Sequence, residues 1–213
     1  MEGIEHLAEL WSINDLKVKK EVTTCLKNTK GDKGVTVIGE EKDRFDITCK
    51  EGSVITIGIK KKGKVTVQEL SQALKKLPEV EGLFLDSSNI WGQIADLDLS
   101  QHHRLKRIQM RWCVIEGELK DLRLSVKLLG KGGKGLKALR LSGKGVRGSL
   151  SDLKHWKGLH FLDLRQTSVT GNLSTDLGKP EALEGLWLPD TDVTGDITDL
   201  LKRTASQGKA AFP

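Results

Sequence analysis

The chain has 213 residues, of which 37% are hydrophobic and 30% charged, and it carries a formal net charge of +6. This length fits one domain, or one domain with a small appendage, and the composition argues against wholesale disorder. No run approaches 18 apolar residues and the acidic start does not resemble a secretory signal, so we expect no membrane insertion. The three cysteines form no CxxC motif and leave an odd thiol, which indicates a reducing, intracellular environment. Whether Cys25 and Cys49 pair stays open.

The charge is distributed unevenly along the chain. Residues 120–160 contain 11 Lys and Arg against 2 Asp and Glu, whereas residues 161–200 contain 2 against 8. A basic segment followed by an acidic one favours oriented docking on a partner, because the summed electrostatic field of the protein steers the encounter. The alternative is that the lysine-rich loops are simply solvated.

The first 52 residues predict two helices and a short strand. Ile4, Leu7 and Trp11 form one apolar helical face, and residues 12–15 form a capping box that opens a second helix. A strand follows from Val35. Further along, the segment from Gln68 has the apolar spacing of another helix.

Five segments then repeat one template. They begin at Leu83, Ile108, Leu139, Leu162 and Leu186 and read L-x-L-x-x-(N/C/T/S)-x-(V/I)-x-G-x-(I/L), except that Lys144 stands at the sixth place of the third segment. The spacings between starts are 25, 31, 23 and 24 residues, close to the range of about 20 to 29 in leucine-rich repeats. The long spacing marks an insertion at about 120–137. Self-similarity at this period predicts a solenoid.

The template has a direct physical meaning. Strand side chains alternate, so the two aliphatic residues of each L-x-L point inward. A small polar residue then hydrogen-bonds the backbone of neighbouring coils. Glycine follows where the backbone needs a conformation that a residue with a Cβ disfavours. We therefore expect parallel strands, paired in chain order, near residues 55–59, 82–86, 107–111, 138–142, 161–165 and 185–189.

The ending (V/I)-x-G-x-(I/L) resembles the plant-type leucine-rich repeat. The resemblance implies an α/β solenoid, a right-handed coil with one parallel sheet on its concave side and an N-terminal cap. Cys49, Gly52, Val54, Ile57 and Ile59 resemble the first strand of such a cap. We expect the cap at 1–52, the solenoid at 53–200 and a tail at 201–213. The family binds partners through variable surface residues, so the resemblance implies little about the particular function.

Motifs that would indicate chemistry are incomplete. The stretch from Gly58 to Lys64 approaches a P-loop, but Val65 stands where Ser or Thr must bind magnesium. The glycines at 130, 132 and 135 follow no dinucleotide-type strand, and the histidines lack partners at metal-ligand spacing. We therefore expect no catalytic residue, no cofactor and no metal site, and hence no enzyme.

The leading functional hypothesis is a protein–protein interaction module, an adaptor or a subunit of a larger assembly. Strand alternation places the residues between and beside the leucines on the concave face, where aromatic and arginine residues collect, as at interface hot spots. The predicted partner-binding residues are Phe84, Asp86, Arg107, Gln109, Arg111, Trp112, Arg140, Phe161, Asp163, Arg165 and Trp187. The alternative is a self-contained surface, in which the aromatic rings fold down over the sheet and the arginines stack on them.

The second hypothesis is a basic accessory protein that contacts RNA or another polyanion through residues 120–147. Lysines among exposed backbone N–H groups could hold a phosphate or an RNA backbone. The predicted contacts are Lys127, Lys131, Lys134, Lys137, Lys144 and Arg147. Salt separates the two hypotheses, because polyanion binding weakens by orders of magnitude between about 50 and 200 mM salt.

Overall fold

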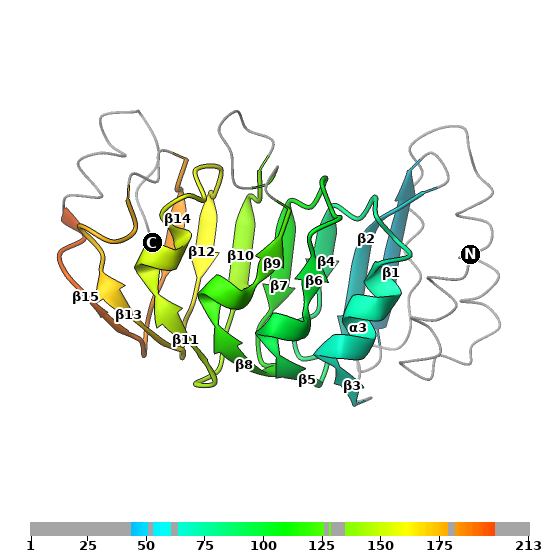
Figure 1. Cartoon of the computed structure of the whole chain (residues 1–213), viewed down its shortest axis with the longest axis horizontal. Helices are drawn as coiled ribbons and strands as arrows, with labels where there is room; N and C mark the ends of the chain where they lie inside the picture. The colour runs from blue at the N-terminus through cyan, green and yellow to red at the C-terminus, as the bar shows by residue number, and fades with distance from the viewer. Residues whose placement is uncertain are drawn as a thin grey trace.

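The computed structural model describes residues 44–50, 53–60, 64–125, 128, 135–178 and 182–198. The helices and strand predicted before residue 44, the tail, and Lys127, Lys131 and Lys134 lie outside these residues. The described residues form stacked coils whose strands run side by side along the length of the molecule (Figure 1). The solenoid expected from the repeats is confirmed.

One side of the solenoid is a long sheet. Strands β2 to β14 of this sheet pair in parallel and in chain order, and β1 adds to β2 in antiparallel fashion. Leu139 is the register partner of Leu162, as the repeat template requires. The strands are β1 (Arg44–Lys50), β2 (Ser53–Lys60), β4 (Gly82–Phe84), β7 (Arg107–Met110), β10 (Ala138–Leu141), β12 (Phe161–Asp163) and β14 (Gly185–Trp187).

A second sheet corrects the expectation of a single one. The stretch (V/I)-x-G-x is itself extended, so successive coils pair here too, in parallel. Its strands are β3 (Val65–Thr66), β5 (Ile90–Gln93), β8 (Val114–Glu118), β11 (Val146–Ser149), β13 (Ser168–Asn172) and β15 (Asp192–Thr194). A two-stranded parallel sheet joins β6 (Asp98–Leu99) to β9 (Arg123–Leu124).

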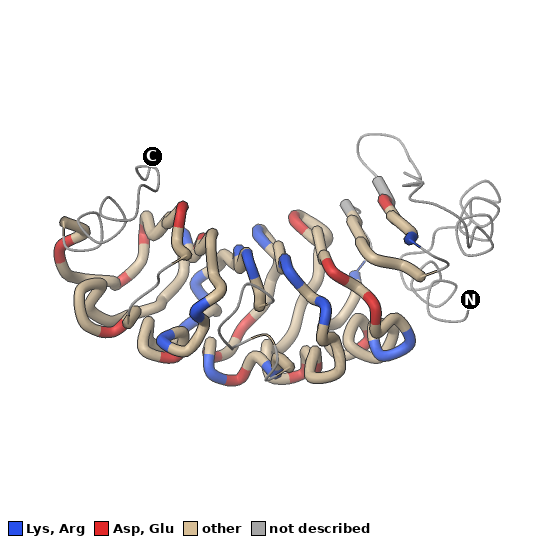
Figure 2. Tube along the Cα trace, turned by 90° about the horizontal axis from the view of Figure 1, so that it is seen from above, with Lys and Arg blue, Asp and Glu red and all other residues tan. Residues whose placement is uncertain are grey.

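Short helices cover the side opposite the long sheet. The helix expected from Gln68 is present as α3 (Val67–Leu74), and Thr66 and Glu69 form a capping box at its start. The described residues of the linkers after β5, β8 and β11 contain 3₁₀ turns, at η1 (Ile94–Asp96), η2 (Leu119–Asp121) and η4 (Leu150–Leu153). Seen from above, the coils follow a shallow arc with the long sheet on its inner side (Figure 2). We call the outward surface of this sheet the concave face.

The core is a column of aliphatic side chains between the sheets and the helices. Leu162 and Leu164 of one coil are fully buried, as the alternation predicted. The template glycine is required by the backbone: Gly148 has φ +122°, and a Cβ there would lie 3.1 Å from the backbone nitrogen of Leu119 in the preceding coil. Coils therefore stack closely where each one turns.

The turn between the two sheets has a conformation that the repeat template did not reveal. The fifth template position is left-handed in every coil, with φ between 57° and 59° at Ser87, Trp112, Gln166 and Asp190, and φ 114° at Gly143. Non-glycine residues rarely adopt this conformation. Its recurrence shows that the stacking of coils imposes the turn.

The polar residues after this turn behave in two ways. The Ser88 hydroxyl donates to the Ile59 carbonyl and the Cys113 thiol to the Leu85 carbonyl, both in the preceding coil. The prediction was wrong for Thr167 and Thr191, whose hydroxyls donate to carbonyls three residues earlier in their own coil. Threonine makes this local bond at little conformational cost.

The cysteines are in different states. Cys49 is disulfide-bonded, whereas Cys113 is a free, buried thiol. The odd number of cysteines therefore does not indicate a reducing compartment, because it reflects one thiol enclosed in the core.

Burial raises the pKa of Cys113 to about 11. Since the thiolate is the reactive form, iodoacetamide at about pH 8 should alkylate Cys113 at least about a hundredfold more slowly in the native protein than in urea. Mass spectrometry of the peptide that contains Cys113 measures this ratio. Equal rates in both states would contradict the burial of the thiol.

The ends of the predicted insertion belong to the solenoid. Residues 119–124 form η2 and β9, and Leu128 and Leu136 are buried. The Leu136 backbone N–H donates to the Leu128 carbonyl, at 3.2 Å. Residues 120–125 of the predicted insertion are therefore part of the regular coil, and Leu122 fills the same core position as Leu97 in the preceding coil.

His102 provides a pH-sensitive element of the core. Its Nε2 lies 3.0 Å from the Leu74 carbonyl oxygen, and its buried Nδ1 has no hydrogen-bond partner in the described part of the chain. Burial lowers the pKa of His102 below its ordinary 6.5, against smaller opposing effects of the hydrogen bond to the Leu74 carbonyl and of the Asp98 charge. The unfolded chain therefore binds this proton more readily than the folded one.

The contribution of His102 to the free energy of unfolding is therefore fully present above about pH 6.5, and it decreases as the pH falls below that value. Between about pH 7 and pH 5 the wild type should lose up to about 1.4 kcal/mol per pH unit more than His102→Gln. Urea unfolding at several pH values measures the difference. An unchanged slope in His102→Gln would contradict the assignment.

Candidate partner-binding face

The concave face is built from rows of residues that the strand register aligns. One row runs across five strands through Phe84, Gln109, Arg140, Asp163 and Trp187, each the register partner of the next. All five come from the predicted set of partner-binding residues. The structure thus brings them side by side, as alternation required.

In a second row of register partners, large residues alternate with small ones. Arg107 has Gly82 as its register partner on one side and Ala138 on the other, and Phe161 stands between Ala138 and Gly185. Arg107 is exposed, whereas the Phe161 ring leans over Gly185, where a Cβ would lie 2.9 Å from its Cδ1.

Two aromatic rings lie flat over glycines of their own strands. A Cβ at Gly82 would be 2.8 Å from a ring carbon of Phe84, and a Cβ at Gly185 would be 2.6 Å from a ring carbon of Trp187. Phe161 stacks on Trp187, with ring centroids 6.4 Å apart and ring planes 24° apart. The glycines thus make room for aromatic rings that lie against the sheet.

An ion-pair network crosses the middle of the face. Arg111 donates from Nη2 and Nε to one oxygen of Asp86, Oδ2, at 2.6 and 3.0 Å, and its Nη1 lies 3.7 Å from the Asp163 carboxylate. Arg165 Nε donates to Asp163 at 2.8 Å, and this bond raises the pKa of Arg165. Asp163 is 1% exposed. These four residues mainly satisfy one another.

Two arginines of the face have no acidic partner among the described residues. Arg107 is exposed. Arg140 stacks over Trp187, with its Cζ 5.7 Å from the ring centroid, and its buried Nε has no hydrogen-bond partner in the described chain. The concave face therefore has cationic donors left over after its internal pairs are formed.

Trp112 lies at the edge of this face rather than within it. It occupies the left-handed turn between β7 and β8, is 55% exposed, and lies under the guanidinium of Arg111 at 4.7 Å. Sequence reasoning did not single out Trp91 and Val114, which are exposed register partners on the second sheet. Period-two alternation in the (V/I)-x-G-x stretch was the signal that could have found them.

The described residues of the predicted polyanion surface do not form one cluster. Lys137 Nζ lies 3.1 Å from Nε2 of His160, which itself bonds Glu184. Lys144 Nζ donates to the Asp190 carbonyl at 2.6 Å, two coils away. Arg147 is exposed on the second sheet. Two of the three side chains thus connect coils.

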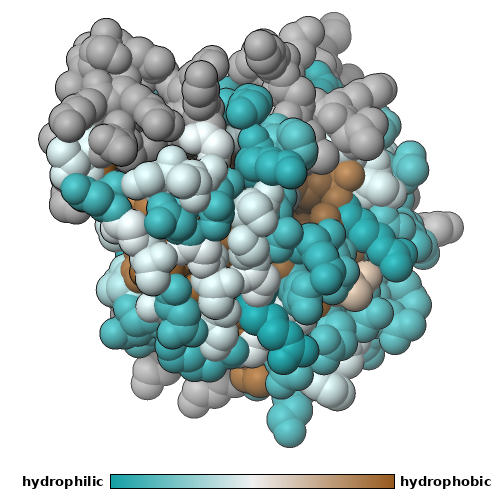
Figure 3. Space-filling view, turned by 60° about the vertical axis from the view of Figure 1, so that its left-hand side comes forward, coloured by the Kyte–Doolittle hydropathy of each residue, from teal (hydrophilic) through white to brown (hydrophobic). Residues whose placement is uncertain are grey.

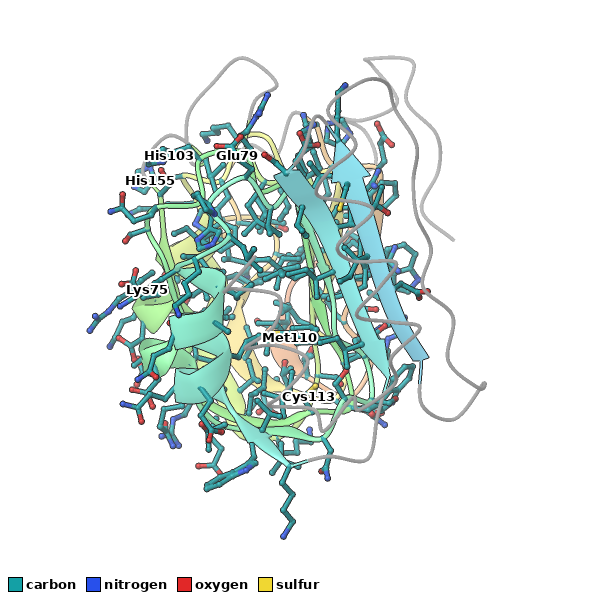
Figure 4. The ribbon with its side chains drawn as sticks, turned by 90° about the vertical axis from the view of Figure 1, so that its right-hand side faces the viewer. Lys75, Glu79, His103, Met110, Cys113 and His155 are labelled. Carbon is teal, nitrogen blue, oxygen red and sulfur yellow. The ribbon has the colours of Figure 1, made fainter. Side chains whose placement is uncertain are left out.

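A groove of about 670 Å³ lies on the helical side of the molecule, away from the concave face. Its lining includes Lys120, Arg123, Lys154, His155 and Trp156. Figure 4 shows His155 on this side with Lys75 and His103, and the long sheet on the other. The groove is therefore a separate basic surface.

The C-terminal edge of the solenoid exposes apolar side chains. A groove of about 270 Å³ there is lined by Leu173, Leu186, Leu188, Val193 and Ile197, among others. In Figure 3, which turns this end forward, small brown apolar areas show between hydrophilic residues. No helix in the described part of the chain has the length and apolar character needed to cross a membrane.

Comparisons with known proteins add little. No family model and no curated protein matches the chain. Among solved structures, an internalin C2 from Listeria monocytogenes aligns with a TM-score of 0.40 and 14% identity, over 96% of this chain and 84% of that one. A similarity this low adds nothing to the fold, which the strand pairing of this chain establishes by itself.

Proposed function

We propose that this protein is a non-catalytic interaction module, an adaptor or accessory subunit, that binds another protein through the concave face. We assign it to the plant-type class of leucine-rich repeats, with a right-handed coil and an N-terminal cap. The observation that supports binding is that Arg107 and Arg140, which have no acidic partner among the described residues, lie beside the stacked rings of Phe161 and Trp187. Arginine and aromatic residues in one cluster are typical of interface hot spots.

The test variant has to spare the internal network. Arg111 bonds Asp86 and lies near Asp163, so its loss would mix reduced binding with reduced stability. Arg107 is exposed and belongs to no ion pair within the described chain. Arg107→Glu is therefore the informative change, and Arg147→Glu on the second sheet is its charge-matched control.

The experiment is affinity purification of the full chain from its native source, with the two variants in parallel. A protein that co-purifies with the wild type and with Arg147→Glu should be lost with Arg107→Glu. Capture of the same protein by all three chains would place the binding surface outside the concave face.

The second candidate function is binding of a polyanion, now at the groove on the helical side. Arg123, Lys154 and His155 line this groove and have no ion pair in the part of the chain that the structure describes. In contrast, its carboxylates are engaged: Asp98 with Ser100 and Lys75, and Asp152 with the Ser149 backbone. Loss of RNA binding in Arg123→Glu but not in Arg107→Glu, together with a steep salt dependence, would favour this function.

A further inference from the structure

We propose that the concave face recognises an acidic peptide segment of the partner, in which an apolar residue accompanies the carboxylates. This inference rests on the proposed function and specifies the chemistry of the partner. It depends on three features of the face: its residual charge, the unsatisfied Arg140, and the position of the aromatic pair.

From β4 to β14 the residual charge of the face is positive, while Asp46 of β1 lies further along the row of Phe84. Arg111 and Arg165 are paired with Asp86 and Asp163, so the two carboxylates and these two guanidinium groups balance. Arg107 and Arg140 remain, without acidic partners among the described residues. A partner that supplies carboxylates would complete the pairing, because charge complementarity selects partners even where it adds little affinity.

Arg140 points to a missing acceptor. Its Nε is buried and has no hydrogen-bond partner within the described residues, although its register neighbour is Asp163. A buried donor left unsatisfied loses the hydrogen bond that water would give it in the unfolded chain. Asp163 does not relieve Arg140, because it bonds Arg165 and lies close to Arg111. Because the Nε is closed to solvent as it stands, an arriving carboxylate accepts from it only when the Arg140 side chain shifts outward.

The two arginines are placed to act together. Arg107 pairs with Ala138, two residues before Arg140 on the neighbouring strand. Strands lie about 4.8 Å apart and rise about 3.3 Å per residue, so the two Cα atoms are about 8 Å apart. Long side chains from such positions can reach neighbouring carboxylates of one extended segment, and guanidinium forks match carboxylates well.

The aromatic pair lies directly beside these donors. Phe161 follows Ala138 across the sheet, and Trp187 follows Asp163. An apolar side chain of the bound segment can rest on the Phe161 ring, beside Trp187 and the Arg140 guanidinium that lies over it, while carboxylates of the segment meet Arg107 and Arg140. This arrangement favours a peptide that mixes acidic and apolar residues.

The surrounding charge disfavours a phosphate backbone on this face. Residues 161–200, at the C-terminal end of the solenoid, carry 8 acidic against 2 basic residues. Figure 2 shows acidic residues in red predominating over basic ones at the C-terminal end of the coil. A uniformly charged polyanion that ran along the solenoid would meet this repulsion, whereas a short acidic segment would not.

The test uses three synthetic peptides and isothermal titration calorimetry on the full chain. The probe consists of three Asp-Glu-Phe-Gly repeats; the second peptide replaces its acids by Asn and Gln, and the third replaces Phe by Ala. An oligouridylate provides the phosphate arm. We expect the probe to bind at least about tenfold more tightly than each of the other three ligands.

The variants locate the site. Arg107→Gln and Arg140→Gln should each weaken binding of the probe by about tenfold or more, and Arg147→Gln by less than about twofold. Arg107→Gln alone keeps the test informative if Arg140→Gln unfolds. No binding of the probe, equal binding of the neutral peptide, equal loss in Arg147→Gln or tighter binding of the oligouridylate would overturn the inference. A partner captured through Arg107 would then still support the proposed function.

Discussion

Replacement of Asp163 by alanine is expected to lower the free energy of unfolding by about 3 kcal/mol. Asp163 is 1% exposed and accepts from Arg165 at 2.8 Å, with Arg111 at 3.7 Å. Breaking a buried ion pair by removing one partner costs about 3 to 5 kcal/mol, because a charge is left uncompensated. The lower end applies here, since both arginines reach partly into solvent. Urea unfolding measures the change.

Asp192→Ala is the matched control for this prediction. Asp192 is an exposed carboxylate on β15 with no ion pair in the described chain. Its removal should change the stability by no more than about 0.5 kcal/mol. A similar small change in Asp163→Ala would show that Arg111 and Asp86 hold the face together without Asp163.

Gly148→Ala is expected to destabilise the protein by about 2 to 3 kcal/mol. The residue has φ +122°, and the new Cβ would lie 2.9 Å from the Asp152 carboxylate and 3.1 Å from the Leu119 backbone nitrogen. Sparsely populated backbone conformations cost about 1 to 3 kcal/mol, and the contact with the preceding coil adds to that cost. The thermal midpoint and urea unfolding both report it.

Gly158→Ala separates this effect from the general cost of a methyl group. Gly158 is buried, but the closest atom to its Cβ would be the Gly135 Cα at 3.4 Å, an ordinary contact. This variant should stay within about 1 kcal/mol of the wild type, with either sign, because alanine restricts the unfolded chain. Equal losses at both glycines would contradict the role of coil stacking at Gly148.

The candidate site was predictable in part. Period-two alternation alone placed Phe84, Gln109, Arg140 and Trp187 on one face, and the register aligns them in one row. Alternation does not tell which charges neutralise one another, because Arg111 and Asp86 lie 25 positions apart in sequence and meet only through stacking. The distinction between paired Arg111 and unpaired Arg107 is therefore a tertiary property.

The sequence by itself determined the coil. Leucines at Leu139 and Leu162, 23 residues apart, specify strands that must lie side by side, because each repeat buries its apolar face only against its neighbours. The recurrent glycine, as at Gly148, identified the point where the backbone needs a positive φ.

Only the tertiary structure decided how neighbouring coils contact one another and which surface charges those contacts neutralise. The second sheet, the left-handed turn at Trp112 and the bond from Lys144 to the Asp190 carbonyl two coils away all depend on how coils meet. Local patterns specify which way a side chain points, but partners from other coils decide whether its charge is neutralised or left for a ligand. That is why the unsatisfied Nε of Arg140 became visible only in the folded chain.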